Sequence, residues 1–424
     1  MKFTPMHDFH YKGDELFCEE VSIQHIAEQV GTPCYIYSHR TLIRHFHAFD
    51  DAFQSIPHII AYAMKANSNI AILRLLAKEG SGADIVSGGE LFRALKAGVP
   101  SNKIVFAGVG KSSEEIRYAL ESKILMFNVE SPHEILQIHE VAKTMGLRAC
   151  VALRINPDID PQTHPYISTG LKKSKFGIAA DQALKEFESA NTLSHIDVAG
   201  VHCHIGSQLT QVTPFVDAIT KTVSLIQTLQ SQGIQIRYMN IGGGLGITYS
   251  DETPPHPKEL AEAISPLLHT ASCQIIMEPG RSIAGNAGIL VTRVLYNKIG
   301  ANKQFVIVDA AMNDLLRPSL YEAYHDIQPI LKNESAPVKT VDVVGPICES
   351  GDFLAKDRKM PQTESGDLLA VMSAGAYGFT MASHYNSRPK IPEILVKEDK
   401  VMVIRQRETY EDLIRGESIP EIFI

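Results

Sequence analysis

The sequence predicts an α/β protein in which a (β/α)8 barrel of the TIM type is followed by an antiparallel β domain. Its 424 residues exceed what one core usually supports. Between about residues 58 and 285, eight short apolar runs alternate with helical patterns, as in a closed parallel barrel. After Gly288, strand patterns follow one another without helices, and several alternate polar with apolar residues.

The barrel is expected to occupy residues 36–285. Its apolar runs lie near Ile59, Ala83, Ile104, Leu125, Val151, Val201, Met239 and Ile275. Two helix starts have the spacing of a capping box, Ser112 with Glu115 and Ser131 with Glu134. A further helical pattern stops at Gly98, as expected for a C-terminal cap.

The β domain is expected to comprise residues 286–424 and to take in residues 1–35. Its predicted strands cover residues 289–299, 305–309, 338–344, 367–372 and 393–405. Residues 16–21 are also strand-like and could pair with this domain.

One connection within the barrel is unusually long. Residues 156–177 follow the fifth predicted strand and are rich in Pro, Asp, Gly and Lys before any helical pattern begins. Long irregular segments in compact domains are often lids or binding loops. We interpret this segment as an active-site loop, with a solvated insertion as the alternative.

The composition excludes several classes of partner. The formal net charge is -8, and the only basic cluster, Lys172, Lys173 and Lys175, is too short for a nucleic-acid surface. No stretch approaches about 18 consecutive apolar residues, and the first thirty residues contain no signal-peptide core. The six cysteines form no Cys-x-x-Cys pair, which indicates reduced thiols. We therefore expect a cytoplasmic protein.

Polar, charged and glycine residues gather where the predicted barrel strands end. They are Lys65, Asp84, His204 with Ser207, Gly242 to Gly244, and Glu278 with Gly280 and Arg281. In such barrels, catalytic groups lie at the carboxyl ends of the strands, and phosphate commonly binds after the seventh and eighth. Consecutive glycines let backbone amides approach an anion, and an adjacent arginine adds charge-assisted hydrogen bonds.

This set of side chains suits pyridoxal phosphate. The cofactor needs a lysine for its aldehyde, a partner for its pyridine nitrogen, a group against its ring and a phosphate cradle. Lys65, Glu278 and His204 can fill the first three roles, and the glycines with Ser207 the fourth. A carboxylate partner keeps the ring nitrogen protonated, which favours loss of carbon dioxide over racemisation.

Each residue also has a simpler interpretation. Lys65 could be a lysine at a strand end whose amine reaches solvent. His202 and His204 are two apart in a predicted strand and could bind a metal, but no third ligand stands at a recognisable spacing, so no metal site is predicted. The glycines could form only a tight turn. Their joint occurrence at successive strand ends favours the cofactor.

The motifs as a whole resemble the diaminopimelate decarboxylase family of fold-type III pyridoxal-phosphate enzymes. The likeness runs through YAMKANSN around Lys65, SGADIVSGGE around Asp84, HCHIGSQ around His204, NIGGGLG and MEPGRSI. It continues through RPSLYEAYH, GPICESGD and GAYGF, which separate this family from ornithine and arginine decarboxylases. The resemblance implies an alanine-racemase-like barrel with a C-terminal β domain, and conversion of meso-2,6-diaminopimelate to L-lysine and carbon dioxide.

The resemblance also assigns roles to single residues. Lys65 would bind the cofactor as a Schiff base, His204 would stack on its ring, and Glu278 would meet its pyridine nitrogen. Further cofactor contacts would come from Asp84, Ser207, Gly243, Gly244, Gly280, Arg281 and Tyr377. The substrate would be recognised by Arg281, Arg317, Tyr321, Glu349 and Tyr377. Cys348 would return a proton to the α-carbon, reaching the cofactor of the other subunit in a homodimer with shared sites.

Without the resemblance, Cys348 would be read as a buried structural thiol, because no cation stands near it in sequence to lower its pKa. Four other functions remain open: a decarboxylase acting on ornithine, arginine or carboxynorspermidine, a racemase, a pyridoxal-phosphate carrier without turnover, and a Schiff-base aldolase. Arg317 and Tyr321 argue against a substrate without a distal carboxylate, and Glu278 argues against a racemase.

Overall fold

The computed structural model describes residues 6–159 and 175–423. The chain divides into two compact units, one of Met1–Leu42 with Ala284–Ile424 and one of Ile43–Ile283. The division falls after Leu42 because strand β4 (Cys34–Ser38) pairs with strands of the first unit. The residues just after it belong to helix α2 (His39–Ala52), along which the chain passes into the second unit.

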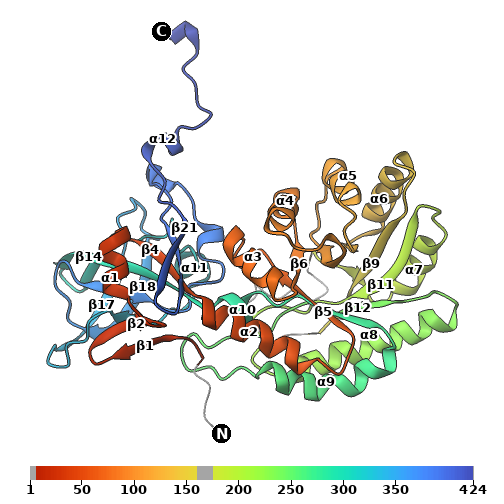
Figure 1. Cartoon of the computed structure of the whole chain (residues 1–424), viewed down its shortest axis with the longest axis horizontal. Coiled ribbons are helices and arrows are strands. Elements are labelled where there is room, and N and C mark those ends of the chain that lie inside the picture. Colours follow the sequence, from red (N-terminus) through yellow and green to blue (C-terminus); the bar gives the residue numbers. More distant parts are fainter. Residues whose placement is uncertain (1–5, 160–174, 424) are drawn as a thin grey trace. The chain divides into compact units, whose positions relative to one another are not determined.

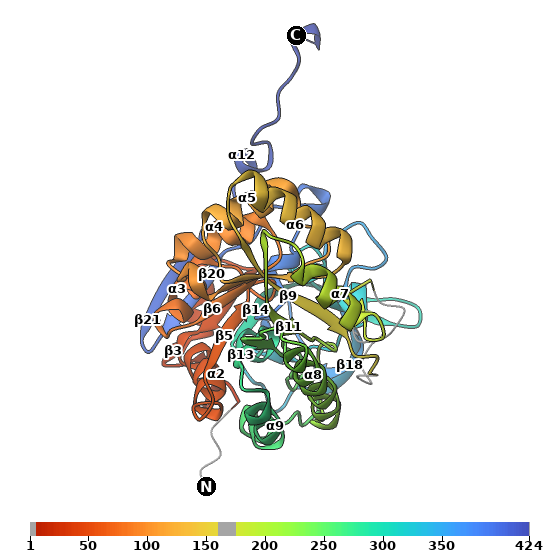
Figure 2. The same cartoon turned by 90° about the vertical axis from the view of Figure 1, so that its right-hand side faces the viewer.

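The second unit is a closed barrel of eight parallel strands, as predicted. The strands are β5 (His58–Ala63), β6 (Gly82–Ile85), β7 (Ile104–Phe106), β8 (Met126–Val129), β9 (Ala149–Asn156), β11 (Ile196–His202), β12 (Tyr238–Asn240) and β13 (Gln274–Met277). Closure comes from the pairing of β13 with β5, and β8 pairs with β9. A short extra strand, β10 (Ile178–Ala179), adds to β9. Figure 2 shows the helices arranged around these strands.

The barrel helices begin and end at the expected signals. They include α3 (Ile70–Lys78), α4 (Gly88–Ala97), α5 (Ser113–Glu121), α6 (Pro132–Thr144), α7 (Ala183–Asn191), α8 (Thr213–Ser231) and α9 (Pro257–Ala271). A capping box joins Ser112 and Glu115 at α5, and α4 ends at Gly98 in the left-handed conformation. In the described part of the chain, no helix has both the length and the apolar character needed to cross a membrane.

At α6 the predicted capping box is only half formed. Ser131 accepts a hydrogen bond from the Glu134 backbone N–H, as an N-cap does. The Glu134 carboxylate instead accepts from the Glu130 N–H at 2.8 Å and pairs with Lys111 Nζ at 2.5 Å. A buried lysine needs a carboxylate partner, and this requirement takes Glu134 away from the cap.

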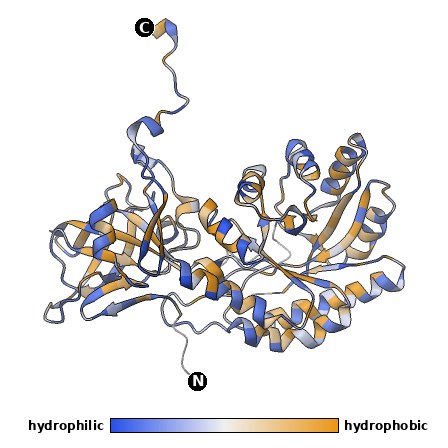
Figure 3. Ribbon diagram, in the orientation of Figure 1, coloured by the Kyte–Doolittle hydropathy of each residue, from blue (hydrophilic) through white to orange (hydrophobic). Residues whose placement is uncertain are grey.

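The barrel interior is packed with apolar side chains rather than open. Ala61, Val105, Met126, Ala152 and Ile276, from five of the strands, form one buried cluster. Figure 3 shows hydrophobic strands surrounded by helices that carry both hydrophilic and hydrophobic residues. A filled barrel leaves the strand ends and their loops as the place for a ligand.

The first unit is mostly antiparallel, with two parallel strand pairs. Its large sheet runs β18 (Phe353–Pro361), β17 (Val338–Val344), β15 (Gln304–Val308), β14 (Gly288–Ile299), β4, β20 (Glu393–Lys397) and β21 (Lys400–Arg405). β19 (Leu368–Val371) pairs with β14, and β16 (Ile327–Pro329) pairs with β19. The parallel pairs are β15 with β17 and β4 with β20. Figure 1 labels β4, β14, β17, β18 and β21 of this sheet.

The N-terminal segment joins this unit, as predicted. β1 (Phe9–Lys12), β2 (Glu15–Cys18) and β3 (Val21–Ser22) form a small antiparallel sheet ahead of helix α1 (Ile23–Val30). The Leu16 N–H donates to the Ile330 carbonyl at 2.8 Å. Leu16 and Ile26 pack in one buried cluster with Ile289 and Ile394.

Candidate active site

Lys65 and Asp84 form an ion pair where two neighbouring barrel strands end. Lys65 stands two residues after β5, and Asp84 lies in the adjacent strand β6. The lysine Nζ is 2.7 Å from Asp84 Oδ2, and the aspartate side chain is completely buried. The amine of Lys65 therefore pairs with a buried carboxylate, while its own side chain is 40% exposed.

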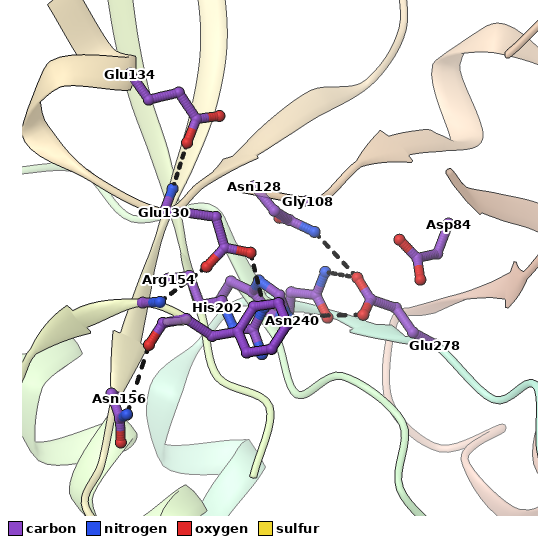
Figure 4. Close-up of polar contacts among 12 residues, drawn as sticks. Asp84, Gly108, Asn128, Glu130, Glu134, Arg154, Asn156, His202, Asn240 and Glu278 are labelled. Carbon is purple, nitrogen blue, oxygen red and sulfur yellow. Dashed lines mark hydrogen bonds and ion pairs between the residues drawn. The ribbon is translucent and has the colours of Figure 1, made fainter. Parts of the chain in front are cut away.

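Glu278 follows β13 and is buried among polar side chains from other strands. Its Oε1 accepts hydrogen bonds from Asn128 Nδ2 at 3.0 Å and from Asn240 Nδ2 at 2.6 Å. On the other oxygen, Oε2, His202 Nε2 lies 3.6 Å away, too far for a good hydrogen bond but close for an ion pair. Figure 4 shows these three side chains converging on the carboxylate.

The pKa values of the two buried acids, Asp84 and Glu278, shift in opposite directions. Burial and the negative charge of Glu278 raise the pKa of Asp84 to about 7, although Lys65 opposes them. Burial alone would also raise the pKa of Glu278, but His202, Lys65 and the Asn240 hydrogen bond bring it well below its ordinary value. Asp84 can therefore exchange a proton near neutral pH, while Glu278 stays ionised.

The turn after β12 requires glycines because other backbone segments lie against it. A Cβ on Gly243 would stand 2.3 Å from the Glu278 carbonyl oxygen, and one on Gly244 would stand 2.7 Å from the Gly206 carbonyl oxygen. Gly242 and Gly244 also have positive φ angles. Near this turn, a Cβ on Gly280 would press on Ala63 at 3.0 Å. The glycines thus hold the ends of β5, β11, β12 and β13 close together.

Arg281 and Ser207 lie together and provide donors for an anion. The buried guanidinium places Nε 3.3 Å and Nη2 3.1 Å from Ser207 Oγ. Its Nη1 is 2.6 Å from the hydroxyl of Tyr249, a residue that the sequence analysis did not identify. Tyr249 lies in the loop after the glycine turn, and nothing in its sequence context distinguishes it from a core aromatic residue.

His204 lies beyond the end of β11 and against the glycine turn. A Cβ on Gly242 would be 2.7 Å from its Nδ1. Burial, followed by the positive charges of Arg154 and Lys65, lowers the pKa of His204 well below its ordinary value, so the ring is neutral. Because β11 ends at His202, the alternation that would place both histidines on one face does not extend to His204.

A buried ion-pair network, also missed from sequence, lies beside the site (Figure 4). Arg154 Nη1 is 2.7 Å from Glu130 Oε1, and the Gly177 N–H donates to Glu130 Oε2 at 2.8 Å. The guanidinium of Arg154 also lies 4.7 Å from the Phe176 ring centroid. The network therefore holds the end of the predicted 156–177 loop, of which residues 160–174 lie outside the described part of the chain.

The remaining candidate residues belong to the first unit. Arg317 is buried at the start of α11 (Arg317–Tyr321), with Nη1 2.8 Å from His325 Nε2. Arginine can only donate, so His325 Nε2 accepts and its Nδ1–H donates to the Met372 carbonyl at 2.8 Å. Tyr321 and Tyr377 are half-buried, and Tyr377 has a φ of 56°.

Cys348 is exposed, so its interpretation as a buried structural thiol is wrong. Its backbone N–H donates to Asn386 Oδ1 at 2.8 Å. The turn that carries it is held by buried Asp352, which accepts from the Ile347 N–H at 2.7 Å. The neighbouring Glu349 is also exposed, 3.4 Å from the Tyr385 hydroxyl.

Comparison with known proteins identifies the family. Residues 39–285 match the family model for the pyridoxal-dependent decarboxylase, pyridoxal binding domain. The diaminopimelate decarboxylase of Vibrio cholerae is 51% identical over 97% of this chain and 99% of its own. The Aquifex aeolicus enzyme of the same name is 50% identical over 95% of this chain and 96% of its own. The chain belongs to the diaminopimelate decarboxylase family.

The structure of a family member agrees with this assignment. Diaminopimelate decarboxylase from Helicobacter pylori, complexed with L-lysine, superimposes with a TM-score of 0.90 at 46% identity, covering 93% of this chain and 98% of that chain. Membership in the diaminopimelate decarboxylase family makes the chain a pyridoxal-phosphate-dependent enzyme. The barrel residues fit that cofactor, since an amine, an ionised carboxylate and a glycine-lined turn with an arginine meet at its strand ends.

Replacing Gly243 with alanine should impair cofactor binding. The added Cβ would overlap the Glu278 carbonyl, so the end of β13 must move. Overpacking typically costs about 1–3 kcal/mol, which predicts roughly ten- to hundredfold weaker binding of pyridoxal phosphate to the apoenzyme. The exposed Gly110 has open space for a Cβ and provides the matched control, Gly110→Ala. Equal affinities for both variants, measured by equilibrium dialysis, would contradict this account of the turn.

Asp84 should make the stability of the apoenzyme depend on pH. Because its pKa is about 7 in the folded protein and near 3.8 ordinarily, the folded state binds more protons between these values. The contribution of Asp84 to stability therefore falls as the pH rises. The free energy of unfolding of Asp84→Asn should therefore rise relative to that of the unmodified apoenzyme by up to about 1.4 kcal/mol per pH unit across this range. Urea unfolding at several pH values measures the difference, and a constant difference would refute the shift.

Proposed function

We propose that the chain removes carbon dioxide from meso-2,6-diaminopimelate and releases L-lysine, using the barrel site for pyridoxal phosphate. The observation that carries this proposal is that an amine, Lys65, and an ionised carboxylate, Glu278, both lie at the strand ends close to Asp84. When bound, the cofactor supplies an electron sink for the carbanion left by carbon dioxide. The names and lysine-bound structure of the relatives support the choice of substrate.

Lys65 would be the amine that binds the cofactor's aldehyde. An amine is nucleophilic only when it has lost its proton, and Asp84 Oδ2 is 2.7 Å from Lys65 Nζ. With a pKa of about 7, the aspartate can hold the proton that the lysine gives up. Asp84 thus acts on the lysine and also helps to position it.

Glu278 serves the pyridine nitrogen, and its low pKa keeps it ionised at neutral pH. An anion at this position holds a proton on the ring nitrogen and favours decarboxylation over racemisation. His204 would contact the ring, where its neutral form would avoid repelling that positive charge. The phosphate would be held by Ser207, Gly243, Gly244, Gly280 and Arg281, and, as the family resemblance implies, by Tyr377.

Recognition of the substrate's distal end falls to Arg281, Arg317, Tyr321, Glu349 and Tyr377. Arginine suits a carboxylate because its planar fork binds both oxygens. His325 fixes the guanidinium of Arg317 in one orientation, which preorganises it for such a pair. The exposed carboxylate of Glu349 suits the distal ammonium.

Cys348 acts as the acid that returns a proton to the α-carbon, and it does so in the site of a partner subunit. Its exposure in the single chain, together with that of Glu349, leaves both side chains available to a second copy. The active assembly is then a homodimer with shared sites. Six unpaired cysteines fit a reducing compartment, and we place the enzyme in the cytoplasm.

The substrate assignment is tested by measuring carbon dioxide release from diaminopimelate, ornithine, arginine and lysine. Release should occur with diaminopimelate and be at least about a hundredfold slower with the others, because their distal ends lack the carboxylate that Arg317 would bind. Arg317→Lys keeps the charge but loses the planar fork, so it should lose activity toward diaminopimelate alone. Comparable release from ornithine or arginine would refute the assignment.

Replacing Cys348 with alanine should lower kcat by roughly a hundredfold or more, since general acid catalysis typically contributes about that factor. The variant should retain its cofactor, because Cys348 is not part of the barrel site. Cys150, a half-buried thiol in β9, provides the control Cys150→Ala. Normal turnover by Cys348→Ala would exclude the cysteine as the proton donor.

A further inference from the structure

The two oxygens of Glu278 have different surroundings. Oε1 accepts from both Asn128 and Asn240, at 3.0 and 2.6 Å, and these bonds occupy its two lone pairs. In the described part of the chain, no hydrogen bond reaches Oε2, and His202 Nε2 lies 3.6 Å from it. Oε2 is therefore the oxygen with capacity left for a further donor.

The orientation of Asn240 follows from its second bond. Its Oδ1 accepts from the Gly242 N–H at 2.9 Å, which forces its amide nitrogen to face Glu278. A flipped amide would lose both interactions. Asn240 therefore ties the carboxylate of Glu278 to the glycine turn through one rigid side chain.

His202 is a buried polar ring without a structural partner. It is 1% exposed, and neither ring nitrogen has a hydrogen bond among the described residues. Burying such a group without a partner is unfavourable, and native proteins rarely do so. The ring lies in the last position of β11 with Nε2 toward Oε2, which makes Glu278 the group it serves.

We propose that His202 and Asn240 are positioning residues that hold Glu278 ionised and in a single orientation, with Oε2 presented to the pyridine nitrogen of the cofactor. Asn128 and Asn240 occupy Oε1, so the carboxylate cannot rotate without breaking two bonds. His202 places its Nε2 beside Oε2, 3.6 Å away. Among the described residues, Lys65, Asp84 and Arg154 are further charged groups that act on Glu278 or on its neighbour His204.

This inference rests on the proposed role of Glu278 and extends it to residues that would not touch the cofactor. If it is correct, removing either neighbour leaves Glu278 in place but weakens its hold on the proton of the ring nitrogen. A purely structural role would lower stability without changing the protonation of a bound cofactor.

The test is nitrogen NMR of the holoenzyme reconstituted with pyridoxal phosphate labelled with 15N in the ring, titrated with pH. The unmodified enzyme should keep the ring nitrogen protonated across its stable range. His202→Leu and Asn240→Leu should each lower the pH at which this proton is lost, Asn240→Leu by about one to two units, the usual worth of a hydrogen bond to a charged group. His202→Gln retains an N–H donor and should titrate nearly like the unmodified enzyme.

Glu278→Gln separates failure of the inference from failure of the proposed function. If Glu278→Gln loses the ring proton while both leucine variants titrate like the unmodified enzyme, the positioning role is overturned and the role of Glu278 stands. If Glu278→Gln also titrates normally, the assignment of Glu278 fails and the inference fails with it. Should a leucine variant not fold, Asn128→Leu removes one donor from Oε1 and must show a shift in the same direction.

Discussion

The structure of the site depends on keeping one carboxylate ionised inside a protein. An isolated buried carboxylate would normally take up a proton, because transfer from water to an apolar interior is strongly unfavourable. Glu278 avoids this through hydrogen-bond donors from strands β8 and β12, and through the imidazole of His202 in β11, which lies 3.6 Å from Oε2. A ring of parallel strands is suited to this task, since each strand end contributes one side chain to the same point. The backbone carbonyl of Glu278 also packs against Gly243, so the position of this charged residue depends on the close packing of the glycine turn.

Asp84 shows how the same environment yields a second chemical role. It lies in the same site as Glu278 but has no amide donors, and its Oδ1 has no hydrogen-bond partner among the described residues. Burial therefore dominates, and its pKa rises to about 7. Two acids of similar intrinsic strength are separated into one that remains charged and one that can carry a proton. The difference comes from which strand ends face each of them.

Much of the fold could be predicted from sequence because the signals were local. All eight barrel strands follow from apolar runs, and Ser112 and Gly98 mark helix ends as expected. The β unit was harder. Residues 393–405 form a hairpin rather than one strand, and β18 was missed because its Lys and Arg residues mask the alternation of an edge strand. Pairing between segments far apart in sequence, as for β4, has no local signal.

In the site, the sequence identified side chains with distinctive chemistry at strand ends, and it missed those that act on them. Asn128, Asn240 and Tyr249 are ordinary polar residues whose importance lies only in which atoms they face. The Glu130–Arg154 pair joins residues 24 apart and likewise has no sequence signature. The exposure of Cys348 was also not predictable, because a single cysteine in a turn has no local pattern that distinguishes an exposed thiol from a buried one.

The most direct measurement of the central claim is to locate the cofactor's covalent attachment. Reduction of the holoenzyme with borohydride fixes the bond between the cofactor and its lysine, and peptide mass spectrometry then finds the modified residue. The account predicts a single pyridoxyl group on Lys65, the amine that lies 2.7 Å from Asp84. Modification of any other lysine, or none at Lys65, would contradict it.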